Sequence, residues 1–192
     1  MSYVQVYTGD GKGKTTAAIG LCVRAIGAGQ RVLFMQFMKE CNYSEHSVLP
    51  AISETITLES VGKPYFIARI EDIPPEILAS YGDGCVVFER GNPPADYVEK
   101  VVGGLRRAAC AIESGEYDLV ILDEINCAIF FELLDVDDVL AALDRRSSNT
   151  EVVLTGRGAP QALIDYADLV TEMREIKHYY NIGVQARRGI EN

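Results

Sequence analysis

Short apolar runs alternate along the chain with segments in which apolar residues recur every three or four positions. The runs at 4–7, 31–37, 119–122 and 151–154 are largely apolar, as strands buried on both faces are, and 55–58 and 169–172 are shorter candidates. Helical spacing predicts helices from Thr15 to Gly27, over 95–114, 125–134 and 136–146, and from Pro160 onward. The sequence therefore predicts an α/β protein with a mostly parallel sheet and helices on both faces.

One stretch departs from this alternation. Residues 62–94 contain five of the seven prolines and several glycines. An irregular segment of this length inside a compact domain is usually a functional loop. Since 192 residues are the size of one domain, we expect a single nucleotide-binding domain over 1–192 with a lid-like segment at about 62–94.

The segment between the first strand and the first helix has the composition of a phosphate-binding loop. Glycines let successive N–H groups turn toward phosphate oxygens, and the start of the following helix adds partial positive charge. Lys14 supplies a cation for the phosphate chain, and the Thr15 hydroxyl is sited to ligate Mg²⁺. The pattern G-x-x-x-x-G-K-[ST] is not met in full, because its first position falls on Thr8, so Thr8 or Gly9 must make that turn. The loop reads Gly9, Asp10, Gly11, Lys12, Gly13, Lys14, Thr15, Thr16.

Two other strands end in residues that suit the same ligand. Asp123 and Glu124 follow the strand at 119–122, where carboxylates can hold a metal directly or through water. Arg157 follows the strand at 151–154, and its planar guanidinium suits a terminal phosphate. Taken alone, an acidic pair is also typical of a helix cap, and an arginine in a turn is also typical of a solvated surface. Together with the loop, they predict binding of a nucleoside triphosphate with Mg²⁺.

The charge balance narrows the range of partners. The chain has 28 acidic and 18 basic residues and a formal net charge of −10. Broad nucleic-acid binding needs basic surfaces, so we expect no nucleic-acid partner. No apolar stretch approaches the ~18 residues of a membrane-spanning helix, and the first residues lack the pattern of a signal peptide. The five cysteines include no C-x-x-C pair, which is typical of reduced thiols in a cytoplasmic protein.

Taken together, the motifs resemble those of one family, the phosphate-loop type of ATP:corrinoid adenosyltransferase. The similarity spans about residues 3–54 and 95–190. It rests on the run from Thr8 to Gly20, on Arg24 and Ala25 with Gly27 and Gly29, on Gln36 and Phe37, on Leu122 to Glu124, on Thr155 to Gly158, and on the tail residues Lys177, His178, Gly183, Val184, Ala186, Gly189 and Ile190.

This resemblance implies the fold of a recombinase-like P-loop nucleotide-binding protein. It implies transfer of the 5′-deoxyadenosyl group of ATP to the Co(I) of a corrinoid, with triphosphate leaving whole. On that basis, residues 8–16 and Arg157 bind ATP, Lys14 and Arg157 stabilise the leaving triphosphate, and Thr15 and Glu124 hold Mg²⁺. A flavoprotein-type reductant and a homodimer are compatible with the resemblance.

The similarity is weaker on the corrinoid side of the site. Such enzymes often carry an N-terminal extension that helps to cover the corrinoid, whereas this chain begins directly at its first strand. They often have a Phe and a Trp thought to displace the lower axial ligand of Co(II), and this chain has no Trp. Val86 and Phe88 are the best replacements, and Arg24 is assigned to the same side. Ordinary core packing is the alternative for Phe88.

Two other classes of function stay open at this point. In a recombinase-like ATPase, Glu124 would polarise a water molecule and the product would be phosphate. A non-catalytic ATP- or corrinoid-binding protein needs no reactive residues. The intact set of Lys14, Thr15, Glu124 and Arg157 favours an enzyme.

Overall fold

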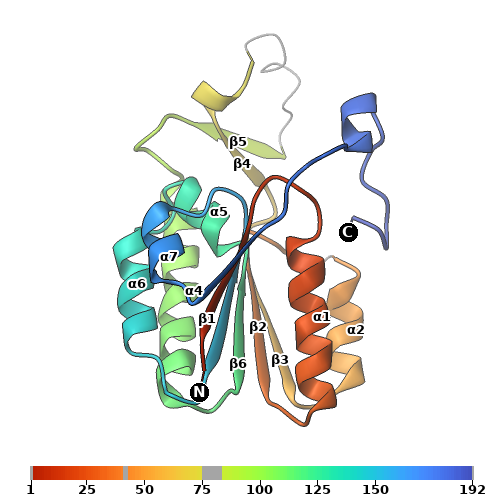
Figure 1. Cartoon of the computed structure of the whole chain (residues 1–192). Helices are drawn as coiled ribbons and strands as arrows, with labels where there is room; N and C mark the ends of the chain where they lie inside the picture. Colours follow the sequence, from red (N-terminus) through yellow and green to blue (C-terminus); the bar gives the residue numbers. More distant parts are fainter. Residues whose placement is uncertain (1, 41–42, 75–83, 192) are drawn as a thin grey trace.

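A six-stranded sheet forms the centre of the computed structural model, which describes residues 2–40, 43–74 and 84–191 (Figure 1). The strand order is β3-β2-β6-β7-β1-β8, and the neighbouring strands pair in parallel. The strands are β1 (Val4–Thr8), β2 (Val32–Phe37), β3 (Ile56–Val61), β6 (Leu119–Asp123), β7 (Glu151–Thr155) and β8 (Leu169–Glu172).

Helices cover both faces of this sheet (Figure 1). The helices are α1 (Lys14–Gly27), α2 (Glu45–Ile52), α4 (Ala95–Ser114), α5 (Ile125–Phe130), α6 (Val136–Asp144) and α7 (Gln161–Tyr166). Helices α1 and α2 lie on one face and pack Cys22 and Leu49 against strand residues such as Phe34. Helices α4 to α7 lie on the other face, where Leu105 packs in a second core with Leu122.

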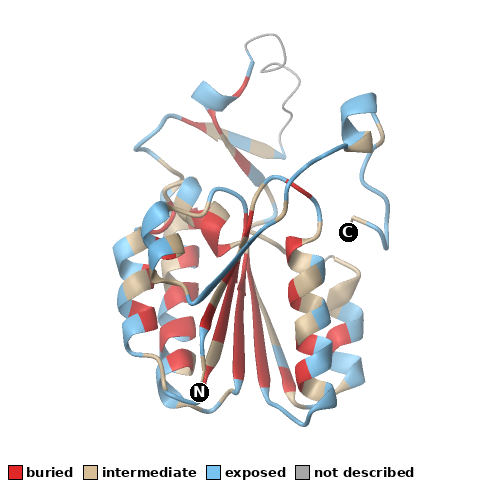
Figure 2. Ribbon diagram, viewed as in Figure 1, coloured by how far each residue is buried: buried red, intermediate tan, exposed pale blue. Residues whose placement is uncertain are grey.

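Burial explains why the strongest strand signals were continuous apolar runs. Every residue of β2 and β6 is buried, and Figure 2 shows these strands red along their length between the two helical layers. The predicted α/β architecture with a mostly parallel sheet is therefore confirmed. None of the described helices combines the length and the apolar character that crossing a membrane requires.

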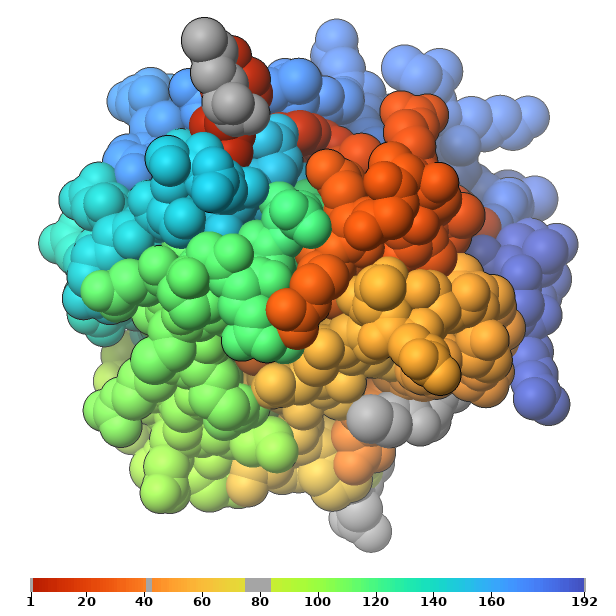
Figure 3. All heavy atoms as spheres, turned by 90° about the horizontal axis from the view of Figure 1, so that it is seen from below, coloured from red at the N-terminus to blue at the C-terminus, as the bar shows by residue number. Residues whose placement is uncertain are grey.

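The parallel arrangement gathers the candidate residues at one edge of the sheet. The phosphate loop follows β1, Asp123 ends β6, and Thr155 ends β7, which lies between those two strands. Figure 3 shows the opposite end of the molecule, where the turns before β2, β6 and β7 pack together. There the Asp118 N–H donates to the Arg31 carbonyl at 2.9 Å, and the Glu151 N–H donates to the Asp118 carbonyl at 2.9 Å.

The elements differ in several places from those the sequence predicted. Helix α2 was missed because it contains Pro50 and buries only Leu49, so its helical pattern is weak. Strand β3 continues three residues beyond the predicted 55–58. Helix α5 ends at Phe130 rather than at residue 134, and Glu132 just beyond it has a left-handed φ of 60°, which a continuing helix does not allow.

The segment 62–94 is more regular than predicted. Strands β4 (Phe66–Arg69) and β5 (Cys85–Phe88) form a separate two-stranded parallel sheet beyond the carboxyl edge of the main one (Figure 1). A parallel pair cannot be joined by a tight turn, so it leaves no hairpin signal in the sequence. The rest of the lid prediction concerns residues 75–83, which lie outside the described residues.

Candidate active site

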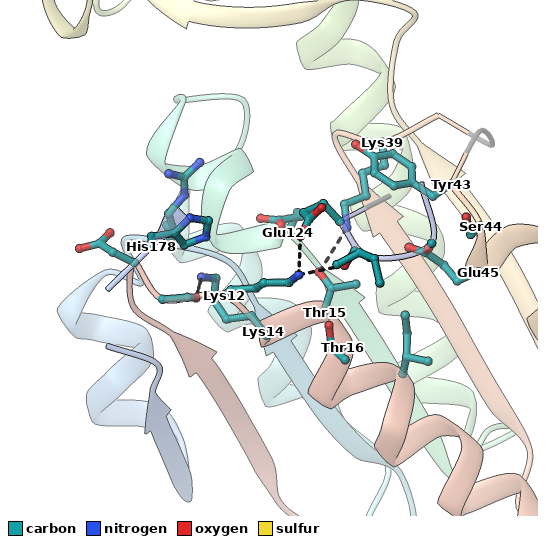
Figure 4. Close-up of a pocket in the computed structure, with 18 residues that line it drawn as sticks. Lys12, Lys14, Thr15, Thr16, Lys39, Tyr43, Ser44, Glu45, Glu124 and His178 are labelled. Carbon is teal, nitrogen blue, oxygen red and sulfur yellow. Dashed lines mark hydrogen bonds and ion pairs between the residues drawn. The ribbon is translucent and has the colours of Figure 1, made fainter. Parts of the chain in front are cut away.

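A cavity of about 560 Å³ lies over the phosphate loop at the carboxyl edge of the sheet (Figure 4). Its walls come from the loop, from the end of β2, from the start of α2, from the turn after β6, from the turn after β7, and from the C-terminal segment. The lining residues are 10–16, Ile19, Lys39, 43–45, Glu124, Arg157, His178 and 189–191. The structure thus brings most of the predicted nucleotide-binding residues together.

The turn into the loop is made at Gly9. Gly9 has a φ of 94°, and a Cβ atom there would lie 2.4 Å from the carbonyl oxygen of Met173. The segment after β8 braces the loop, because the Gly11 N–H donates to the Met173 carbonyl at 2.7 Å and the Met173 N–H donates to the Thr8 carbonyl at 2.8 Å. Thr8 completes β1, and its hydroxyl accepts from the Ala159 N–H at 3.2 Å. Neither Thr8 nor Gly9 lines the cavity.

The two loop lysines have different partners. The Lys14 ammonium donates to the carbonyls of Gly9 and Gly11 at 2.6 and 2.9 Å, and burial lowers its pKa. The Lys12 ammonium instead pairs with the Glu191 carboxylate at 2.8 Å and donates to the Tyr179 hydroxyl at 3.1 Å. Lys14 therefore lies inside the loop, whereas Lys12 is held by the C-terminal segment.

Asp123 connects the loop to three strands. This fully buried carboxylate accepts hydrogen bonds at Oδ1 from the hydroxyls of Thr15 (2.9 Å) and Thr155 (2.6 Å). Its Oδ2 accepts from the Gln36 amide (3.0 Å) and the Lys39 ammonium (2.8 Å). Four donors occupy the lone pairs of a carboxylate. Asp123 thus orients the Thr15 hydroxyl and leaves no free oxygen for a metal ion.

Glu124 is the carboxylate that faces the cavity (Figure 4). Its φ of 61° turns the chain sharply after β6, and its N–H donates to the Thr155 hydroxyl at 3.0 Å. One carboxylate oxygen accepts from the Cys127 thiol at 2.8 Å. Burial first, and then the charge of Glu124, raises the pKa of Cys127 to about 12, so the thiol is a neutral donor.

The donor set fits Mg²⁺ when a phosphate chain is present. The Thr15 hydroxyl and the Glu124 carboxylate are hard oxygen ligands, and Mg²⁺ is usually held by one or two protein groups, phosphate oxygens and water. Across residues 2–40, 43–74 and 84–191, no group of three or more His, Cys, Asp or Glu residues is placed to hold a metal ion. Phosphate oxygens would therefore have to complete the coordination shell.

Lys39 is a member of the site that the sequence interpretation missed. It follows β2 by two residues, and its side chain is only 12% exposed. Burial acts to lower its pKa, but the nearby carboxylates of Asp123 and Glu124 outweigh burial and raise it. The available signal was a lysine just beyond a buried strand, at the sheet edge where Asp123 ends its own strand.

Arg157 stands between this cavity and a second one of about 470 Å³. Phe130, 43% exposed, lines the second cavity, and the guanidinium of Arg69 lies 4.0 Å from its ring centroid. Asp10 and Arg157 belong to the walls of both cavities, so the two spaces adjoin. The second cavity is lined by Asp10, Ala68, Arg69, Asp72, Ile73, Cys127, Phe130, Phe131, Arg157 and Gly158.

The three residues predicted for the corrinoid side line neither of these cavities. Phe88 is 7% exposed and packs in the core, with its ring centroid 6.4 Å from that of Phe131. Val86 is 38% exposed on β5. Arg24 lies in the last turn of α1, ten residues and therefore about 15 Å along the helix from Lys14. There its charge suits the negative end of the helix dipole.

Comparisons with known proteins agree on one family. The family model described as ATP:corrinoid adenosyltransferase BtuR/CobO/CobP matches residues 1–192. A corrinoid adenosyltransferase of Pseudomonas aeruginosa is 33% identical over 187 residues, which cover 97% of this chain and 81% of that protein. The corrinoid adenosyltransferase CobA of Salmonella typhimurium is 32% identical over 189 residues, 97% of this chain and 83% of that protein. An uncharacterized protein of Nostoc sp. is 34% identical over 201 residues, and this chain spans 48% of its length.

Proposed function

The chain belongs to the ATP:corrinoid adenosyltransferase family, and from this premise we propose that its site transfers the 5′-deoxyadenosyl group of ATP to the reduced cobalt of a corrinoid. In this reaction Co(I) attacks the ribose C5′, a cobalt–carbon bond forms, and the C5′–O bond breaks. Triphosphate leaves with the bonding electron pair. The observation that carries the proposal is a phosphate loop whose Thr15 is tied to Asp123, beside a second cavity bounded by Arg157.

On the nucleotide side, the residues act on a leaving group that gains negative charge. Lys14 within the loop and Arg157 across the cavity are placed to hold the triphosphate, and Lys12 is a further cation of the same wall. Removing one such preorganised charge typically costs about 2–4 kcal/mol of transition-state stabilisation. The net charge of −10 does not prevent binding, because exposed charges beyond roughly 8–10 Å are largely screened.

Mg²⁺ belongs to this proposal as the cation that Thr15 and Glu124 would hold. When bound, it supplies charge neutralisation for the phosphate oxygens. Asp123 would serve it indirectly, because the carboxylate accepts the proton of the Thr15 hydroxyl and so fixes the orientation of that oxygen. A lone pair of the same oxygen accepts a hydrogen bond from Lys39, whose ammonium would have to give way to the metal ion. Cys127 fixes the Glu124 carboxylate from the other side.

On the corrinoid side, the cavity beside Arg157 supports a placement of the corrin ring next to the ribose. Phe130 offers an exposed aromatic face there, and Ile73 and Phe131 line the same cavity. Val86 and Phe88 remain the sequence-based proposal for the group that displaces the lower ligand of cobalt. The exposure of Phe130 supports this residue over the buried Phe88 for that role.

The reaction consumes Co(I), so an electron donor must act on Co(II) before the transfer. A flavoprotein-type reductant fits this need, and it remains a proposal together with a homodimer and a cytoplasmic location.

The test is a single-pot reaction with ATP, Mg²⁺ and chemically reduced corrinoid. We expect a light-sensitive cobalt–carbon product and an equal amount of inorganic triphosphate. Steady release of orthophosphate without the cobalt product would instead identify an ATPase. Tight binding of both substrates with neither product would identify a non-catalytic binding protein.

A further inference from the structure

The backbone of Lys39 is held in one place by strand β3 and the turn after it. A Cβ atom on Gly62 would lie 2.3 Å from the Lys39 carbonyl oxygen, so only glycine permits this approach. The Ser60 hydroxyl donates to that same carbonyl. Met38, the residue before it, has a left-handed φ of 59°. A backbone conformation that is sparsely populated and closely packed fixes where the Lys39 side chain starts.

From that point the side chain reaches the centre of the site. Its ammonium lies 2.8 Å from Asp123 Oδ2 and 3.2 Å from Thr15 Oγ1, and 5.2 Å from the centroid of the Tyr43 ring. Figure 4 shows Lys39 approaching from the β2 side, whereas Lys12 and Lys14 approach from the loop. Lys39 therefore places a positive charge on the wall of the cavity that faces the loop.

The position of Lys39 brings its positive charge close to two carboxylates of the site. Glu124 borders the cavity that a triphosphate must take, and the buried carboxylate of Asp123 accepts a hydrogen bond from Thr15, which lines the same cavity. Asp123 accepts three hydrogen bonds from uncharged groups. The carboxylate therefore stays hydrogen-bonded if the Lys39 ammonium moves away from it toward a phosphate oxygen. The flexible four-carbon stem of lysine allows such a movement of about an ångström or two without a change in the backbone.

We propose that Lys39 is a triphosphate-binding residue of this site, a third lysine that contacts the phosphate chain beside Thr15. This inference rests on the proposed function, because it assigns Lys39 to the leaving group of that reaction. The alternative is that Lys39 serves only as the counter-ion of Asp123 and never touches the substrate. The two roles predict different changes in binding affinity. A residue that contacts the phosphate chain affects the affinity for a highly charged ligand, but not the affinity for an uncharged one.

The experiment compares inorganic triphosphate with adenosine, each titrated calorimetrically in Mg²⁺ and without corrinoid. Lys39→Gln keeps a donor toward Asp123 but removes the charge. We expect roughly 10- to 100-fold weaker triphosphate binding, the range for one lost charge-assisted hydrogen bond, and unchanged adenosine binding. Lys39→Arg should restore most of the affinity for triphosphate. Lys63→Gln is the matched control, because Lys63 is also ion-paired, with Asp96 at 2.8 Å, but lies outside the cavity.

Two results would overturn the assignment. One is a folded Lys39→Gln protein that binds triphosphate like the wild type. The other is an equal loss of triphosphate and adenosine binding together with a lower melting temperature. If Lys39→Gln does not fold, the double variant Lys39→Gln with Asp123→Asn takes its place, because it leaves no buried carboxylate without its counter-ion. Its affinity for triphosphate is then compared with that of Asp123→Asn alone. These titrations contain no corrinoid and measure triphosphate binding alone. If the wild type failed to form the cobalt product in the separate adenosylation assay, that result would count against the proposed function and not against the assignment of Lys39.

Discussion

The Thr15 hydroxyl donates a hydrogen bond of 2.9 Å to the buried carboxylate of Asp123, across 108 positions of sequence. This contact joins the first turn of α1 to the end of β6. Thr155 reinforces this contact from β7, which lies between β6 and β1, because its hydroxyl donates to the same carboxylate oxygen. The position of the hydroxyl expected to ligate Mg²⁺ is therefore set by the sheet as much as by the loop.

Removing this carboxylate should destabilise the whole protein. In Asp123→Ala the buried Lys39 loses its ion pair, and the donors of Thr15, Thr155 and Gln36 lose their acceptor. Breaking a buried pair in this way typically costs about 3–5 kcal/mol, so urea unfolding should show a loss of that size. Asp123→Asn, which keeps the shape and one acceptor oxygen, should lose less. Equal stability of Asp123→Ala and wild type would show that the network contributes nothing to folding.

Lys14→Ala should abolish ATP binding while the fold stays intact. The Lys14 ammonium contacts only carbonyls of its own loop, so its loss removes no contact between elements of the core. Calorimetric titration with ATP and Mg²⁺ measures the affinity, and thermal unfolding measures the fold. A folded variant with unchanged ATP affinity would contradict the assignment of the phosphate loop.

The loop, the two strand ends and the layered architecture were predictable because each leaves a local signal. Continuous apolar runs mark strands buried on both faces, and glycines with lysine and threonine mark a phosphate loop. Lys39 was not predictable in the same way, because its role depends on the register of β2 beside β6, which places Gln36 opposite Asp123. Register is a property of pairing across the sheet, and no local pattern encodes it.

The residues proposed for the corrinoid side were even harder to predict from local sequence patterns. Phe88 and Phe130 are both aromatic residues beside apolar neighbours in the sequence, and nothing local distinguishes them. Packing does, because β5 turns Phe88 toward the core while the end of α5 leaves Phe130 exposed beside Arg69. Helix α5 ends early for the backbone reason already given at Glu132, and that ending places Phe130 at the cavity.

Glu124→Gln should lower the rate of adenosyl transfer strongly and weaken its dependence on Mg²⁺. The amide keeps the shape of the side chain but lacks the charge that a Mg²⁺ ligand supplies. Corrinoid binding should remain nearly unchanged, because Glu124 lines the nucleotide cavity and not the one beside Phe130. Rates measured across a range of Mg²⁺ concentrations test this. Wild-type activity at every concentration would exclude Glu124 as a ligand of Mg²⁺.

Cys127 should resist alkylation at pH 8 although it borders a cavity. Its pKa is raised to about 12, so at pH 8 the thiol is protonated and not the reactive thiolate. Cys110 is exposed on α4 and should react first. Mass spectrometry after timed treatment with iodoacetamide measures both sites in one sample. Labelling of Cys127 as fast as Cys110 would show that Glu124 does not hold the thiol as a donor.

Phe130→Ala and Phe88→Ala should differ in how they affect reactions that start from Co(II) and from Co(I). Phe130 is half exposed at the cavity, so its loss should barely change stability but should slow adenosylation that starts from Co(II). The same variant should react almost normally with Co(I), because a group that displaces the lower ligand aids reduction and not the attack on C5′. Phe88 is a core residue, so Phe88→Ala should cost about 3–5 kcal/mol of stability and reduce both rates alike. If instead Phe88→Ala slows only the Co(II) reaction at an unchanged melting temperature, the sequence-based assignment of Phe88 holds and Phe130 is only part of the wall.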